Sequence, residues 1–188
     1  MSERKNEKNI ANESIIYIKK YFTLHDSTVV SINQLTQIIL NKSSTPGKGL
    51  HKAAELHTLL KSELTYEFIK IFESLKSLLV HMKECVERMK ALQRCIKECK
   101  DKNATTTTAT TASTTLLHSL DVFFNNTMTY FSQDYKLKEK IHETLVHVDG
   151  TCEDELNRIK LMWKESPFLF LIFQKYNVNK LIMEYTQI

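Results

Sequence analysis

The sequence predicts an all-α protein, an elongated antiparallel helical bundle or coiled-coil hairpin with a C-terminal helical element. Only three glycines and two prolines occur among 188 residues, which favours a few long helices over many short strands. From residue 64 to 99, apolar residues are separated by four and three positions in strict alternation, a spacing that holds one stripe of a helix against a partner helix. This seam comprises Leu64, Phe68, Ile71, Leu75, Leu78, Met82, Cys85, Met89, Leu92, Ile96 and Cys99.

The seam helix is not expected to be stable alone. Burying a large apolar side chain contributes at most about 1.5–3 kcal/mol, whereas ordering each residue costs on the order of 1–2 kcal/mol. Fewer than one residue in three of this stretch lies on the seam. The helix must therefore pack on other helices, and the periodicity does not tell whether these belong to the same chain or to another.

The first half of the sequence predicts two long helices behind a polar start. Residues 1–11 are charged and are expected to form a flexible lead-in. Residues 12–41 carry apolar residues at helical spacing and predict one helix, with a candidate break near Asp26. Residues 41–49 hold Pro46 and two glycines and predict a linker before a second helix over 50–101. Together, 12–102 form the N-terminal part.

The second half predicts further helices after a low-complexity segment. Residues 103–115 are almost all threonine and alanine, and are expected to form a flexible tether. Residues 116–188 are expected to pack on the same bundle, beginning with an aromatic-rich helix over 116–148. Thr151 and Asp154 read as a capping pair for a fourth helix. Ser166 and Pro167 predict its end and the start of a last helix, with Ser166 as the cap.

Composition argues against several classes of function. The net charge of +4 comes from lysines spread along helical faces, so direct nucleic-acid binding is not favoured. The apolar run at 168–173 is only six residues long, too short to cross a membrane. The four cysteines form no CxxC pair and follow a polar start, which indicates reduced thiols in the cytosol or nucleus. No phosphate loop or catalytic motif occurs, and neither an enzyme nor a cofactor is expected.

Three local features remain open to a functional interpretation. His81 and Cys85 share a helix face and form half of a metal site, although packing explains such a pair more simply. Thr45 begins a Thr-Pro-x-Lys sequence in the predicted linker, the minimal pattern of a proline-directed, cyclin-dependent kinase, and is a candidate phosphosite. Trp163 and Phe168 flank the Pro167 break. They predict either an aromatic corner of the core or an exposed anchor for a partner.

Three stretches of the chain resemble the cyclin-dependent kinase 2-interacting protein family. The first, Lys-Tyr-Phe-Thr-Leu-His-Asp at 20–26, resembles the family's K-W-x-T-L-N-D, with Tyr21 in place of tryptophan. The second, Phe131-x-x-Asp134-x-x-Leu-Lys138, resembles its Y-x-x-E-x-x-L-K. The third, Leu-x-His at 145–147 followed by Met-Trp163-x-x-x-Pro-Phe168, resembles its L-x-H and M-W-x-x-x-P-[YF], with two extra residues before the tryptophan. The chain also resembles the AFG2-interacting ribosome maturation factor family, which shares the late aromatic-lysine helix and a tryptophan and is the near alternative.

The resemblance implies a nuclear, non-enzymatic adaptor. Its implied partners are a cyclin-dependent kinase, AAA ATPase subunits and a related small helical subunit. Its implied processes are DNA replication, the DNA-damage checkpoint and maturation of the large ribosomal subunit. Tyr21, Phe131, Lys138, Trp163 and Phe168 are then candidate partner anchors. A homo-oligomeric coiled-coil tether is the alternative from another class, and a metal or redox protein using His81 and the cysteines is a third. The oligomeric state does not follow from the sequence.

Overall fold

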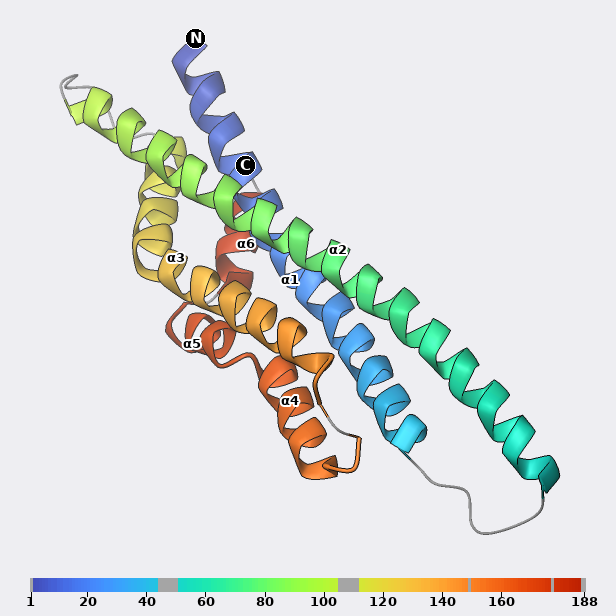
Figure 1. Cartoon of the computed structure of the whole chain (residues 1–188). Coiled ribbons are helices and arrows are strands. Elements are labelled where there is room, and N and C mark those ends of the chain that lie inside the picture. The colour runs from blue at the N-terminus through green and yellow to red at the C-terminus, as the bar shows by residue number, and fades with distance from the viewer. Residues whose placement is uncertain (1, 44–50, 105–111, 149, 177, 187–188) are drawn as a thin grey trace. The chain divides into compact units, whose positions relative to one another are not determined.

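The computed structural model describes residues 2–43, 51–104, 112–148, 150–176 and 178–186 (Figure 1). Over these residues the chain forms six helices and no strand, which confirms the all-α prediction. The helices are α1 (Ser2–Ser43), α2 (His51–Ala104), α3 (Ala112–Leu145), α4 (Glu153–Glu165), α5 (Pro167–Lys175) and α6 (Val178–Thr186).

The three long helices each contribute to two compact units. Unit 1 contains Met1–Thr23, Met82–Tyr135 and Pro167–Ile188, and unit 2 contains Leu24–His81 and Lys136–Ser166. Each unit therefore takes one part of α1, of α2 and of α3, and adds the short helices of the C-terminal region. The apolar stripes of the long helices supply both cores, as helix amphipathicity requires.

Unit 1 has an aromatic core built from α1, α3 and α5. Tyr21 packs edge-on against Phe131, with 5.0 Å between ring centroids, and Phe22 lies 4.9 Å from Phe173. Polar contacts fix the edges of this unit. Arg88 on α2 pairs with Glu13 on α1, and further along α2 Lys100 donates a hydrogen bond to Asp121 on α3. The Arg88–Glu13 pair is partly exposed and adds little stability. Asp121 is buried, so its contact with Lys100 is shielded from water on the carboxylate side.

Unit 2 buries the only tryptophan of the chain. Trp163 on α4 is fully buried, and its Nε1 donates a hydrogen bond of 2.9 Å to Thr28 Oγ1 on α1. The apolar residues buried in the same unit come from all four helix segments and include Ile32, Leu35, Leu75, Leu145, Leu156 and Ile159. A satisfied indole N–H lets a large ring enter the core without an unpaired donor.

The N-terminal helix is longer than predicted. The flexible lead-in expected over 1–11 is wrong, because α1 begins at Ser2 and both Ile10 and Ala11 are buried. These two residues extend the apolar stripe of Ile15 and Ile18 by one further turn. The candidate break near Asp26 is also absent. There the Thr28 hydroxyl donates to the His25 carbonyl oxygen within the continuous helix.

Three other boundaries differ from the predictions. The α1 helix includes residues 41–43, and the rest of the predicted linker, Thr45 included, lies outside the described residues. Residues 103–104 and 112–115, which were predicted to belong to a flexible tether, are helical. The rest of the predicted tether, residues 105–111, lies outside the described residues. Beyond the last predicted helix, the chain adds α6.

The capping pair predicted at the start of α4 is wrong, whereas the helix break predicted at Ser166 and Pro167 is confirmed. Cys152, not Thr151, is the N-cap of α4, and no side chain caps it. Glu153, Asp154 and Glu155 fill the first turn, where acidic side chains interact favourably with the helix dipole. Ser166 lies in the left-handed region, with φ of 39° and ψ of 77°, and ends α4. Its side chain accepts a hydrogen bond from Lys138, and α5 begins directly at Pro167.

Gly150 is required where the α3–α4 connection passes the end of α1. A Cβ atom on Gly150 would overlap the Ser43 side chain and the Ile39 carbonyl oxygen. We expect Gly150→Ala to lower the free energy of unfolding by about 1–3 kcal/mol, because the backbone of α1 would have to move to make room for the added methyl group. Thermal unfolding followed by circular dichroism measures this change. His147→Ala, at an exposed residue of the same connection, is the control, and equal melting temperatures for the two variants would contradict the expectation.

Candidate interaction surface

The predicted α2 seam is covered to different extents in the two units. In unit 1, Met82, Cys85, Met89, Leu92 and Ile96 are all buried. In unit 2, Leu75 is buried, whereas Leu64, Phe68, Ile71 and Leu78 are only half-buried. The apolar stripe is equally continuous in both units. The part of α2 in unit 2 therefore keeps seam surface that the described residues of its own chain leave half-exposed.

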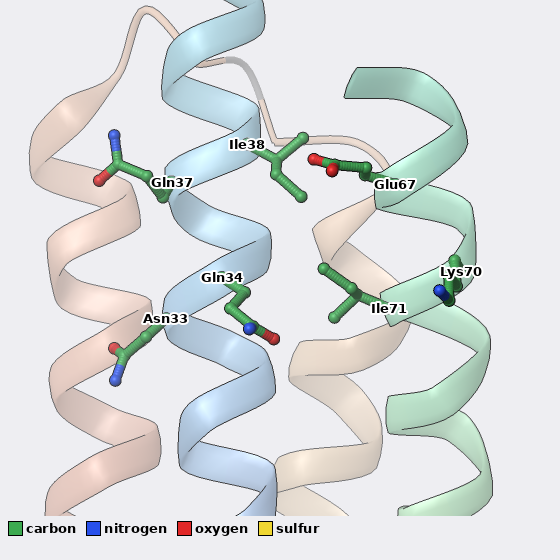
Figure 2. A pocket seen from close by; sticks show the side chains of 7 residues that line it. All are labelled: Asn33, Gln34, Gln37, Ile38, Glu67, Lys70 and Ile71. Atoms are coloured by element: carbon green, nitrogen blue, oxygen red, sulfur yellow. The ribbon is translucent and has the colours of Figure 1, made fainter. Parts of the chain in front are cut away.

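A groove lies beside this half-covered part of the seam, between α1 and α2 (Figure 2). Its volume is about 610 Å³, and Ile38 of α1 and Ile71 of α2 form its apolar floor. Asn33, Gln34 and Gln37 line the α1 side, and Glu67 and Lys70 line the α2 side. Figure 2 shows Ile38 and Ile71 on facing helices with Gln34 and Glu67 beside them, while Asn33 and Gln37 lie on the side of α1 away from α2.

The groove combines apolar and polar side chains from both helices. Its polar groups are three primary amides, one carboxylate and one ammonium group, and they lie beside the two isoleucines. An apolar centre with a polar rim is the pattern of protein–protein interfaces. The volume also lies in the range of small-molecule pockets, roughly 300–1,000 Å³, but an open groove between two helices matches the shape of a third helix better.

An aromatic stack supports the same part of α2 from the α3 side. Phe68 stacks on Phe72, and Phe72 stacks on the His142 ring with 4.0 Å between centroids. Lys42 on α1 places its Nζ 5.7 Å from the Phe68 ring, a cation–π distance. His142 is buried, and its Nε2 lies 3.4 Å from the Phe72 carbonyl oxygen. This burial lowers the pKa of His142, because a charged imidazole loses its hydration there.

Residues from two of the stretches that resemble the kinase-interacting family meet in unit 1. The Tyr21 hydroxyl donates to Asp134 Oδ2 at 2.7 Å and also lies 3.3 Å from the Phe131 carbonyl oxygen. Burial raises the pKa of Tyr21 well above its ordinary value, and the Asp134 carboxylate adds to this effect. The phenol therefore stays protonated and acts as a donor in the core.

Residues from the second and third stretches meet in unit 2. Lys138 is almost completely buried, and its Nζ donates to Ser166 Oγ at 3.0 Å. The same Nζ lies 6.0 Å from the centre of the Trp163 ring. A buried lysine needs such partners, because an unpaired ammonium in the core is costly.

Most of the residues predicted as partner anchors lie in the cores of the two units. Tyr21, Phe131, Lys138 and Trp163 are buried within their own units, which does not fit an exposed anchor for a partner. Their side chains instead join α1, α3 and α4 through the contacts described above. For Trp163, this is the core position that the sequence offered as the alternative to an exposed anchor. Phe168 is half-buried and stays a candidate anchor.

The cysteines and histidines do not gather into a site among the described residues. No group of three or more His, Cys, Asp and Glu side chains in this part of the chain has the geometry to hold a metal. Cys85 is buried on the seam, as expected for a small apolar residue, while Cys95 and Cys152 are exposed. None of the six helices, as far as they are described, is long and apolar enough to span a bilayer.

Several residues of this surface were missed from the sequence. The amides of Asn33, Gln34 and Gln37 carry no motif, and only the packing of α1 beside α2 makes them a groove wall. The Phe72–His142 stack was also missed. Phe68 and Phe72 are four residues apart, which predicts a shared helix face, but nothing in the sequence pairs that face with α3.

No protein-family model matches this chain, and a search among curated proteins finds no similar sequence.

We expect Tyr21→Phe to destabilise unit 1, because it removes the hydroxyl donor to a buried carboxyl group. The loss is about 1–3 kcal/mol. Chemical denaturation with spectroscopic detection measures it. Tyr17→Phe is the matched control, since it makes the same change at a half-buried residue of the same helix. Equal midpoints for the two variants would show that the Tyr21–Asp134 contact does not stabilise the fold.

We also expect stability to depend on pH through His142. Its pKa is lower in the folded chain than in the unfolded chain, so the unfolded chain binds more protons near and below about pH 6.5. The free energy of unfolding should therefore fall as the pH is lowered from about 7.5 to about 5.5. His142→Gln should reduce this dependence, and His147→Gln, at an exposed histidine, should not. Melting temperatures across this range provide the measurement, and an unchanged slope in His142→Gln would exclude the effect.

Proposed function

We propose that this protein is a non-enzymatic nuclear adaptor that joins other proteins through helix packing. The observation that carries the proposal is the half-covered seam of α2 in unit 2, beside the groove floored by Ile38 and Ile71. A helix that keeps an apolar stripe and an adjoining groove gains stability when another helix covers it. The protein's contribution would be to hold partners in position.

The choice of partners comes from the family resemblance. We propose, as for the cyclin-dependent kinase 2-interacting protein family, that this chain links replication and checkpoint kinases. It would also be a subunit of an AAA ATPase complex acting on the replisome and in large ribosomal subunit maturation. In support, residues from separate stretches that resemble this family contact one another. Tyr21 contacts Asp134, and Lys138 contacts Trp163. Such contacts are expected if the residues of these stretches pack against one another in the fold of the family.

The proposed arrangement is an elongated antiparallel hairpin of α1 and α2 with the C-terminal helices packed along it. A related small helical subunit would lay one of its helices along Leu64 and Phe68 and over the groove at Ile71. The ATPase would contact α5, where Phe170 and Phe173 are large exposed apolar residues and Phe168 is half-buried. Large exposed aromatic residues are common at the centres of protein interfaces. Phosphorylation of Thr45 stays a prediction.

Affinity purification from nuclear extract followed by mass spectrometry tests this function. The wild-type chain should recover an AAA ATPase and a small helical subunit. Ile71→Lys should lose the helical subunit, because a lysine in the groove floor cannot be buried without large cost. Ile69→Lys makes the same change two residues away on the exposed face of α2 and should retain it. Circular dichroism checks that both variants fold. Recovery of neither partner by the wild-type chain would overturn the proposal.

A further inference from the structure

A second stripe runs along α2 in unit 2, on the face turned away from the seam. It comprises Tyr66, Ile69, Glu73, Lys76 and Val80, and we call it the outer stripe. Its members are three and four residues apart in alternation, which is the spacing of a coiled-coil contact. Leu59 lies one heptad before Tyr66 on the same line. The chain therefore has two heptad stripes on one helix.

The outer stripe is open to solvent. Tyr66 is 71% exposed, Ile69 55% and Val80 50%, although all three are large and apolar. Glu73 and Lys76 are exposed too, and they form an ion pair with each other at 3.7 Å. Exposed apolar residues are ordinary when they are scattered, but residues that repeat in register along one helix face indicate a contact surface.

The order of side chains along the stripe selects its partner. In an antiparallel pairing of two copies, Ile69 of one copy can lie opposite Val80 of the other, and Glu73 then lies opposite Lys76. The Ile69–Val80 pair and the Glu73–Lys76 pair each occur twice, so the four central pairs match apolar with apolar residues and opposite charges with each other. At each end of the contact Tyr66 lies opposite Lys83, which is exposed and can keep its ammonium group in water. In a parallel pairing in register, Glu73 would face Glu73 and Lys76 would face Lys76. Like charges in facing layers oppose that arrangement.

Other antiparallel registers are less complementary. A shift of one heptad in one direction places Ile69 opposite Glu73, and a shift in the other direction places Val80 opposite Lys76. Both shifts bury a charge against an apolar side chain, which is unfavourable. We therefore propose that the outer stripe is a self-association surface, through which two copies of this chain pair antiparallel with Glu73 and Lys76 setting the register.

This surface is separate from the groove of the proposed function, because the stripe lies on the opposite face of α2. Each copy contributes only Ile69 and Val80 to the apolar layers, so the interface is small. Small interfaces are weak and reversible. The dimer should therefore form at high micromolar concentrations and dissociate at low micromolar ones. Two adaptors joined in this way would present two grooves to their partners.

Sedimentation velocity of the full chain over a range of concentrations tests the pairing. The wild-type chain should show a concentration-dependent dimer. Glu73→Lys and Lys76→Glu should each raise the dissociation constant by about tenfold or more, because each puts like charges opposite one another. The double variant E73K/K76E should dimerise as the wild type does. A mixture of the two single variants should form a mixed dimer, since each then supplies the charge that the other lacks.

The outcomes separate this inference from its competitors. A wild-type chain that is monomeric throughout, or single variants that dimerise as well as the wild type, would overturn it. A parallel dimer would already carry like charges in the wild type, so the single substitutions would not weaken it further. Ile71→Lys should leave the dimer intact and Ile69→Lys should abolish it, the reverse of their expected effects on the helical subunit. Failure of the proposed adaptor function would thus leave this result unchanged.

Discussion

Coverage of the α2 seam is the constraint on which the rest of the structure depends. Most of the stability of a helix in a protein comes from packing of its apolar face rather than from propensity, so the 54-residue α2 needs a surface on which to bury its apolar stripe. In unit 1, its own chain buries Met82, Met89 and Ile96. In unit 2, the same stripe receives only partial cover, and the groove marks the place where cover is missing. In the proposed function, folding and partner binding would then depend on the same kind of helix contact.

The cores are specified by polar contacts as well as by apolar ones. Tyr21 with Asp134, Trp163 with Thr28, and Lys138 with Ser166 each join helices that are far apart in the sequence. Each is a directional contact inside an interior that would otherwise accept several helix rotations. Apolar stripes bring helices together at low specificity, and these hydrogen bonds select one arrangement. Because these side chains are buried, they are not available on the surface for a partner to contact.

Sequence periodicity predicted much of the fold. The α2 helix and the aromatic-rich α3 were expected within a few residues, because long apolar stripes at helical spacing leave few alternatives. Local signals were less reliable. Thr151 matched a capping pattern and does not cap, and the polar start of α1 hid a helix that tertiary burial of Ile10 stabilises. The groove could not be predicted, since Gln34 and Ile71 become neighbours only when α1 and α2 pack.

The corner at Ser166 has a consequence for how this sequence can evolve. Ser166 holds a left-handed backbone, which glycine adopts more easily, while its hydroxyl receives the ammonium of Lys138. Replacement by glycine would relax the corner but remove that acceptor. Replacement by a larger residue would strain the corner. Positions 138 and 166 are therefore expected to covary among related chains, with a shorter or uncharged residue at 138 accompanying glycine at 166.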